Sequence, residues 1–191
     1  MCGRYYIDIS DAELQEIVRS IEENRDSYEQ LTFKTGGEIF PTDIVPVQTG
    51  VGRYDLMKWG FTGFNGKPVI NARSETAFEK PMFRESILER RCLAPASGYY
   101  EWKKEGGRKT KYRLFIPHTP MYLAGCWRQE RGNGLYTFVI LTRPAPECIA
   151  IIHDRTPVII APDRISVWLN GGPDAAAEAA ATAPDLSYTP V

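Results

Sequence analysis

The second residue, Cys2, carries two reactive groups once the initiator methionine is removed. The chain begins Met1-Cys2-Gly3-Arg4, and initiator methionine is usually trimmed when the next residue is small. Cys2 then bears a free α-amine beside its thiol. An α-amine ordinarily titrates near pH ~8 and a cysteine thiol near ~8.5. Such a 1,2-aminothiol captures aldehydes: the amine forms a Schiff base and the thiol closes a thiazolidine ring. A cysteine without function near a frayed terminus is the alternative that position alone leaves open.

Three other polar residues lie in apolar or constrained surroundings and could assist this chemistry. Asn71 could orient a substrate hydroxyl or the Cys2 amine, or else cap a following helix. Glu101 lies among aromatic residues, where a raised pKa would suit a general acid–base, unless the strand is an edge and the side chain faces water. His153 follows two isoleucines and is either a proton shuttle or a structural histidine.

A second set of residues has the chemistry needed to hold nucleic acid. Arginine makes bidentate contacts with phosphate, and flat side chains stack on bases. Residues 80–113 contain ten basic and four acidic side chains, whereas residues 8–30 contain eight acidic and two basic ones. This asymmetry suggests one face suited to an anion such as a nucleic-acid backbone, but composition alone favours the alternative of a solvated lysine-rich hairpin. The candidate DNA contacts are Arg4, Pro41, Trp59, Arg73, Arg84 and Trp102, with core packing as the alternative for the tryptophans.

The totals of the chain limit its class. It has 191 residues, of which 43% are hydrophobic and 25% charged, as expected for one globular domain. No apolar run reaches the length of a membrane-spanning helix, and no signal peptide begins the chain, so a cytoplasmic or nucleoid-associated monomer is expected. The four cysteines form no CxxC pair, so neither a metal nor a cofactor is expected.

The local patterns predict an α+β fold. Strands are expected at 4–9, 38–49 and 51–59, and repeatedly from 92 to 142; helices are expected from Ser10, with Glu13 completing a capping box, at 74–90 with a break near Pro81, and at 145–151 and 162–170. The prediction is a single domain, 1–191, with a mostly antiparallel, barrel-like β-sheet core and a few flanking helices. Residues 172–191 could form a frayed tail, within which the Ala-rich stretch 175–183 is either helical or frayed.

Taken together and in order, the motifs resemble the SRAP (SOS response-associated peptidase) family, which shields abasic sites in single-stranded DNA. No single motif is specific, but at least five occur in register along most of the chain. They are Met1-Cys2-Gly3-Arg4, Pro41, Trp59-Gly60, residues 70–76 (Ile-Asn-Ala-Arg-Ser-Glu-Thr), Phe83-Arg84, residues 91–102 (Arg-Cys-Leu-Ala-Pro-Ala-Ser-Gly-Tyr-Tyr-Glu-Trp) and His153-Asp154-Arg155.

The resemblance implies a mechanism and a partner. The partner would be single-stranded DNA with an abasic site, whose opened sugar presents an aldehyde to Cys2. Glu101 would act as acid–base, His153 would protonate the sugar oxygen or assist the Schiff-base steps, and Asn71 would hold the amine and the sugar. The arginines would bind the phosphates beside the lesion, and Pro41 and Trp102 would contact the flanking bases. The peptidase activity would be autoproteolytic removal of Met1, and the crosslinking would have lyase-like character.

Two other functions fit parts of the sequence. Amidohydrolases with an N-terminal nucleophile also begin at a Cys-Gly and use the α-amine as base, but the Asn-Gly and Gly-Asp motifs of their glutaminase members have no convincing counterpart here. A non-catalytic single-strand binding module would account for Arg84 and Trp102, but would leave Cys2, Glu101 and His153 without a role.

Overall fold

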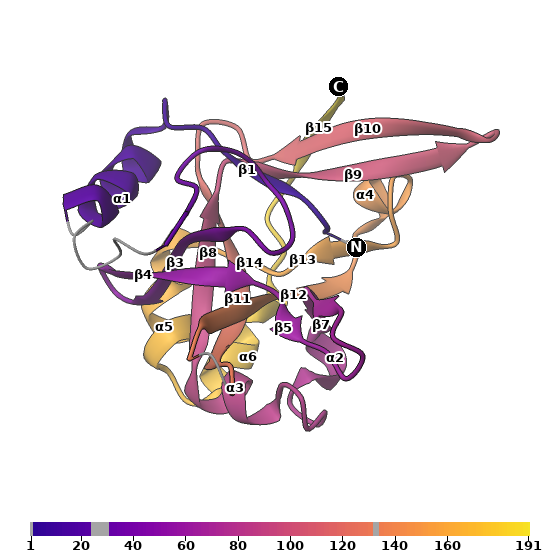
Figure 1. The fold of residues 1–191 in the computed structure, drawn as a ribbon. Helices are drawn as coiled ribbons and strands as arrows, with labels where there is room; N and C mark the ends of the chain where they lie inside the picture. The colour runs from indigo at the N-terminus through magenta and orange to yellow at the C-terminus, as the bar shows by residue number, and fades with distance from the viewer. Residues whose placement is uncertain (1, 24–30, 132–133) are drawn as a thin grey trace.

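Five strands close into a barrel in the computed structural model, which describes residues 2–23, 31–131 and 134–191 (Figure 1). Around the barrel each strand pairs with the next in the order β3, β4, β12, β11, β8 and back to β3. All of these pairs are antiparallel except β4 with β12. The barrel strands are β3 (Ile44–Gly50), β4 (Arg53–Trp59), β8 (Arg91–Ala96), β11 (Met121–Gln129) and β12 (Tyr136–Pro144).

The alternation of side chains along these strands builds two cores. In β8, Cys92, Ala94 and Ala96 face the core that contains the N-terminal strand, whereas Leu93 faces the opposite core. Because apolar residues occupy both sides of β8, the whole strand is buried. A strand buried on both faces reads as a continuous apolar run rather than as an alternating one.

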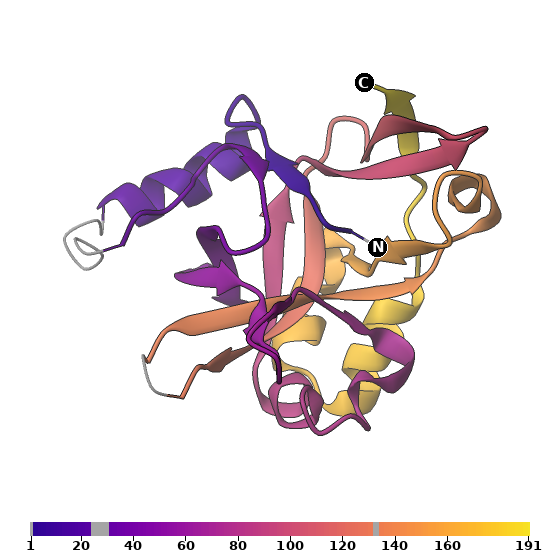
Figure 2. The same ribbon diagram turned by 45° about the vertical axis from the view of Figure 1, so that its right-hand side comes forward.

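Helices cover the core that contains Leu93. In this core, side chains of three helices pack against β8, β11 and β12; the helices are α3 (Arg84–Glu89), α5 (Ile165–Asn170) and α6 (Pro173–Ala181). In Figure 2, α5 and α6 lie together on one side of the barrel, and α1 (Ala12–Glu23) lies apart from them. Trp168 of α5 is fully buried, and its indole nitrogen donates a hydrogen bond to the Cys92 carbonyl at 2.9 Å.

Helix α1 begins one residue later than the capping-box pattern predicts. The carboxylate of Asp11, not the hydroxyl of Ser10, accepts hydrogen bonds from the backbone N–H groups of Glu13 and Leu14, at 3.0 and 3.2 Å. Asp11 therefore caps the helix, and a carboxylate there also interacts favourably with the helix dipole. Leu14, Ile17 and Ile21 form the buried stripe that the spacing predicts.

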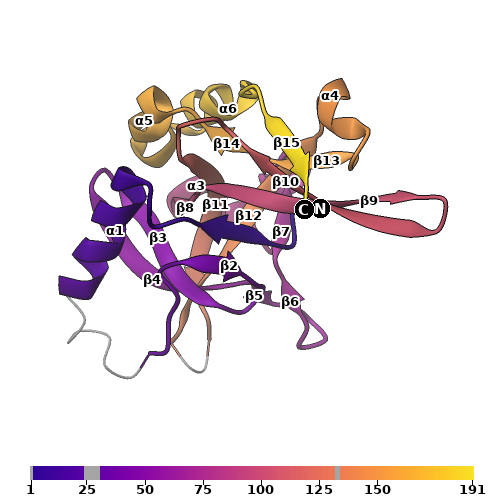
Figure 3. The same ribbon diagram turned by 90° about the horizontal axis from the view of Figure 1, so that it is seen from above.

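A second sheet lies over one end of the barrel and carries the N-terminal strand. Its order is β15-β10-β9-β1-β2, and all of its pairs are antiparallel. Figure 3 shows the hairpin of β9 and β10 projecting beyond the rest of the molecule. The strands are β1 (Tyr5–Ile7), β2 (Gly37–Ile39), β9 (Gly98–Glu105), β10 (Arg108–Phe115) and β15 (Ser187–Pro190).

The remaining elements are short. They are β5 (Phe61–Thr62), β6 (Pro68–Val69), β7 (Asn71–Arg73), α2 (Ser74–Ala77), α4 (Glu147–Ala150), β13 (Arg155–Pro157), β14 (Ile159–Ile160) and the 3₁₀ turn η2 (Pro162–Arg164). Strand β7 pairs with β12 in parallel, and β13 pairs with it antiparallel. These two strands bring the Asn71 and His153 segments to the same end of β12.

The α+β fold with a mostly antiparallel barrel is confirmed. Of the two alternatives for the Ala-rich stretch, the helical one holds, and residues 172–191 form no frayed tail: α6 packs Ala176 and Ala179 into the structure, and β15 pairs with β10. The predicted helix at 162–170 is divided into η2 and α5. Within the described part of the chain, no helix is both long enough and apolar enough to cross a bilayer.

Candidate functional site

Cys2 lies three residues before the N-terminal strand β1, inside the molecule. Its side chain is fully buried, and its thiol lies 3.9 Å from the Arg4 carbonyl. Strand β1 pairs with β9, and the Tyr100 N–H donates a hydrogen bond to the Arg4 carbonyl at 2.8 Å. The pairing of β1 with β9 therefore fixes Cys2 beside the strand that carries Glu101.

Glu101 faces inward from β9, as its aromatic surroundings predict. The residue is 3% exposed, and burial raises the pKa of its carboxyl. Burial also raises the pKa of the Cys2 thiol, and the negative charge of Glu101 raises it further. The Glu101 carboxyl thus acts on the Cys2 thiol, and burial favours the protonated form of both groups. The alternative of an edge-strand glutamate facing water is wrong.

His153 lies at the open edge of this group. Its Nε2 is 4.0 Å from Oε2 of Glu101, and the side chain is 28% exposed, whereas that of Glu101 is 4% exposed. Its Nδ1 accepts a hydrogen bond from the Arg155 backbone N–H at 3.1 Å and lies 2.8 Å from Oδ1 of Asp154. Nδ1 thus lies between the Arg155 N–H and the Asp154 carboxylate, and Nε2 is the ring nitrogen that faces Glu101.

Asn71 holds the backbone of Cys2. Its Nδ2 donates a hydrogen bond to the Cys2 carbonyl at 2.8 Å. Its Oδ1 is buried and accepts no hydrogen bond from the residues that the structure describes. A buried acceptor without a donor costs free energy. Asn71 can therefore accept a hydrogen bond from an incoming hydroxyl or from an amine at Cys2. It is not the cap of α2: the N-cap position is Arg73, and no side chain caps this helix.

An ion pair that the sequence analysis did not single out supports the His153 segment. The guanidinium of Arg155 makes two hydrogen bonds to the Glu75 carboxylate, both 2.8 Å long. Arg155 also donates to the Thr142 hydroxyl at 3.2 Å and to the Thr142 carbonyl at 2.7 Å. Both charged residues occur in motifs that are quoted above, but the sequence does not show that an arginine of one motif pairs with a glutamate of another.

Three of the predicted DNA contacts lie together near Cys2. The guanidinium carbon of Arg4 is 4.1 Å from the ring centre of Phe40 and 5.2 Å from that of Trp102. Arg4 also pairs with Glu38 at 3.5 Å. Phe40 is partly exposed and directly precedes Pro41, in a turn where the Thr42 N–H donates to the Trp59 carbonyl at 2.9 Å. Arg4, Pro41 and Trp102 thus belong to one surface.

The structure places the other predicted contacts separately. Arg73, at the end of β7, and Arg84, at the start of α3, are both exposed. Trp59 is fully buried, its ring packs on Tyr5, and its indole nitrogen donates to the Ile70 carbonyl at 3.0 Å. The core alternative therefore holds for Trp59, and its ring offers no face to a base in this structure.

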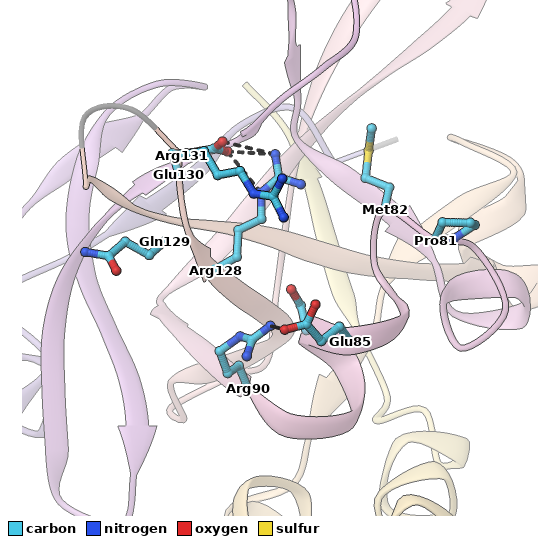
Figure 4. Close-up of a pocket in the computed structure, with 9 residues that line it drawn as sticks. Pro81, Met82, Glu85, Arg90, Arg128, Gln129, Glu130 and Arg131 are labelled. Carbon is cyan, nitrogen blue, oxygen red and sulfur yellow. Dashed lines mark hydrogen bonds and ion pairs between the residues drawn. The ribbon is translucent and has the colours of Figure 1, made fainter.

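A pocket at the far end of β11 is separate from the Cys2 group (Figure 4). Two of its three arginines are already engaged: Arg90 pairs with Glu85 at 2.8 Å, and Arg128 pairs with Glu130 at 2.9 Å. None of the predicted catalytic residues lines it. Among the described residues, no three His, Cys, Asp or Glu side chains are placed to hold a metal ion.

With this geometry described, comparison with known proteins identifies the family. The model of the family described as SOS response associated peptidase (SRAP) matches residues 1–191. The chain belongs to the SRAP family. A Bacillus subtilis relative named abasic site processing protein YoaM is 40% identical over 110 residues, covering 55% of this chain and 48% of the relative. The Escherichia coli abasic site processing protein YedK is 33% identical over 120 residues, covering 60% and 54%.

Solved structures show the same SRAP fold. A protein from Bacteroides thetaiotaomicron matches with a TM-score of 0.80 at 22% identity. The match covers 100% of this chain and 92% of the Bacteroides chain. A protein from Bordetella bronchiseptica has a TM-score of 0.78 at 19% identity, covering 100% and 99%. The matched region of this SRAP chain spans about half the length of the curated relatives named above.

Proposed function

We propose that this SRAP protein senses abasic sites in single-stranded DNA and shields them during the DNA damage response by forming a covalent crosslink through Cys2. The observation that carries the proposal is the meeting of four groups from separate parts of the chain: Cys2, the Asn71 amide on its carbonyl, the Glu101 carboxyl and His153. Relatives named abasic site processing proteins support the choice of substrate.

Removal of Met1 comes first. While Met1 is attached, the Cys2 nitrogen is an amide and cannot form a Schiff base. Hydrolysis of this single peptide bond releases methionine and gives Cys2 its α-amine. Autoproteolysis by the same site accounts for the peptidase in the family description, and we limit the proposed peptidase activity to this bond.

The crosslink then forms in two steps, Schiff-base formation and ring closure by the thiol. The Cys2 amine attacks C1′ of the opened sugar, and loss of water leaves a carbon–nitrogen double bond. The thiol adds across that bond: sulfur binds the carbon, and the thiol proton ends on the nitrogen. Because burial keeps the Cys2 thiol protonated, a neighbouring group must carry this proton, and Glu101 fits that role because its own pKa is raised.

His153 and Asn71 complete the proposed site. His153 directs Nε2 toward Glu101 from the exposed edge, where it can give a proton to the sugar ring oxygen as the ring opens or take it back as the crosslink reverses. The free Oδ1 of Asn71 can receive the Cys2 amine or a sugar hydroxyl. Arg4 and Arg73 would bind phosphates beside the lesion, with Arg84 further along the strand, and Pro41 and Trp102 would contact the bases.

A denaturing gel tests this proposal. Purified protein, with Met1 removal verified by intact mass, is mixed with single-stranded DNA that contains one abasic site. A heat-stable band of protein bound to DNA is expected for the wild type and for Cys148→Ala, which removes an exposed cysteine outside the proposed site. No band is expected for Cys2→Ala, and slower formation for Glu101→Gln. Absence of the band from Met1-free wild type would refute the proposal, and glutamine hydrolysis would be tested next.

A further inference from the structure

The outer face of the second sheet carries a row of cations and aromatic rings that begins at Cys2. Side chains that lie directly opposite each other in paired strands share a face. Trp102 pairs with Lys111, Tyr100 with Arg113, and Lys104 with Lys109. All six side chains therefore lie on the face opposite Glu101.

Strands β1 and β2 continue this face across the sheet. Tyr6 pairs with Gly98 of β9 and with Glu38 of β2, and its ring centre is 5.3 Å from that of Tyr100. The Lys111 ammonium is 3.7 Å from the Tyr100 ring centre. We call the set Arg4, Tyr6, Tyr100, Trp102, Lys104, Lys109, Lys111 and Arg113 the outer face. It carries five positive charges, and Glu38 of β2 lies beside two of them, Arg4 and Lys111.

Three of the five cations on this face have no carboxylate partner among the described residues. On the other side of the hairpin, Lys103, which shares the side of Glu101, pairs with Glu105 at 3.0 Å. Lys104, Lys109 and Arg113 are exposed, and none lies within 4.0 Å of a carboxylate oxygen of any described residue. Unpaired cations that alternate with aromatic rings are the pattern that binds the backbone and bases of a single strand.

We infer that the outer face binds the single-stranded DNA that flanks the lesion, so that the strand runs from Cys2 outward along the hairpin. The inference rests on the proposed function, because that function places the lesion at Cys2. Arg4, two residues from Cys2, contacts Trp102, which follows Glu101, so the outer face starts at the site itself. The eight residues of β9 extend roughly 26 Å, long enough for about 4 nucleotides, the lower end of site sizes in single-strand binding folds.

The test separates binding from crosslinking. The triple variant Lys104→Gln, Lys109→Gln, Arg113→Gln removes exposed charges outside the proposed catalytic group. A charge-keeping variant, Lys104→Arg, Lys109→Arg, Arg113→Lys, and a charge-matched variant on other elements, Arg19→Gln, Arg53→Gln, Arg164→Gln, are the controls. Equilibrium binding is measured on single strands that contain a tetrahydrofuran abasic analogue, which has no aldehyde and cannot crosslink. The analogue carries either two or ten nucleotides on each side, and thermal unfolding confirms that each variant folds.

On the long strand, the triple Gln variant should bind at least tenfold more weakly than the wild type. The slope of log affinity against log salt should fall by about 2, because each lost phosphate contact removes about 0.7. Both controls should bind like the wild type, and all proteins should bind the short strand alike. Equal binding of the long strand by the triple Gln variant and the wild type would overturn the inference, as would a loss of the same size in the charge-matched variant. Failure of the proposed function would appear separately, as no crosslink between wild type and a true abasic site.

Discussion

Arg155 holds Glu75 by two parallel hydrogen bonds, each 2.8 Å long, between the two ends of the guanidinium and the two carboxylate oxygens. This pair links β13 to α2 across β12, and Arg155 also donates its backbone N–H to Nδ1 of His153. The residue whose backbone N–H contacts the His153 ring is thus itself held by a bidentate ion pair. Such a pair requires the planar fork of arginine.

Glu75→Gln should therefore loosen the His153 segment. The substitution removes the negative charge and leaves one side-chain oxygen that can accept a hydrogen bond from Arg155. We therefore expect the unfolding free energy at pH 7 to fall by roughly 1–2 kcal/mol and crosslinking to become slower. Arg155→Lys, made in the protein that retains Glu75, should also slow crosslinking, because a single ammonium cannot make both bonds. A rate loss without a change in the pH dependence of crosslinking would show that the pair does not act through His153.

The same ion pair predicts an acid-sensitive part of the stability. Arg155 lowers the pKa of Glu75 from its ordinary 4.5 to about 2. A carboxyl with a lowered folded-state pKa stabilises the protein above its unfolded-state pKa, and this contribution is lost as the pH falls from 4.5 toward 2. Unfolding free energy measured over this range should fall more steeply for the wild type than for Glu75→Gln.

Gly98 allows β1, β9 and β10 to approach one another closely. A Cβ at this position would lie 2.4 Å from the Leu114 carbonyl oxygen and 2.7 Å from the Tyr6 ring. Because the first of these atoms is backbone, the strand would have to move, and we expect Gly98→Ala to cost about 1–3 kcal/mol and to slow crosslinking by displacing Glu101. Gly172→Ala, where a Cβ would meet nothing within 4 Å, is the control. Equal stability of the two variants in urea titrations would contradict this account.

The sequence predicts the chemistry better than the connections between distant segments. The sequence is sufficient to select Cys2, Asn71, Glu101 and His153. Each is a reactive or polar residue in an apolar or terminal segment, and this contrast is visible in the neighbouring residues alone. The pairing of Arg155 with Glu75 depends on β13 and β7 both joining β12, which no local pattern encodes. Trp59 shows the opposite problem: a tryptophan beside a turn reads equally well as a stacking surface or as core, and only the closure of the barrel decides.

Local signals also underestimated the C-terminal stretch. An alanine-rich segment after a Gly-Gly pair has weak amphipathic character, and it is ordered because Ala176 and Ala179 fit closely against β14 and its neighbours. Strand β15 has four residues, and its partner β10 is more than 70 positions away. Short strands with distant partners are set by tertiary contacts rather than by propensity.

Glu38 neutralises part of the outer face, so its removal should strengthen DNA binding. Its Oε1 lies 2.5 Å from the Lys111 ammonium and 3.5 Å from Nη1 of Arg4. Glu38→Gln frees both cations for phosphates, and we expect affinity for a single strand to rise about threefold at low salt, with a steeper salt dependence. Glu79→Gln, which removes an exposed carboxylate outside the second sheet, should change affinity little. Unchanged binding by Glu38→Gln would mean that Arg4 and Lys111 do not meet the DNA.

Glu101 should cost stability at the pH where it works. Burial raises its pKa, so the folded protein holds this proton more tightly than the unfolded chain does. For a carboxyl shifted in this direction, stability is greatest below the unfolded-state pKa of about 4.3 and declines as the pH rises through the folded-state pKa. Glu101→Gln cannot ionise, so it does not lose stability in this way. At pH values above the folded-state pKa of Glu101, the Tm of Glu101→Gln should exceed that of the wild type by at least about 2 °C.

The measurement is a series of thermal unfolding curves from pH 4 to pH 8 for the wild type, Glu101→Gln and Glu105→Gln. The Tm difference between wild type and Glu101→Gln should widen as the pH rises, while crosslinking by Glu101→Gln remains slow throughout. Glu105 lies at the exposed end of the same strand, so its variant should show no such widening. A Tm for Glu101→Gln below that of the wild type at pH 8 would mean that the ionised carboxylate is stabilised by its neighbours, and a general acid–base with a pKa raised by burial would then be the wrong description of Glu101.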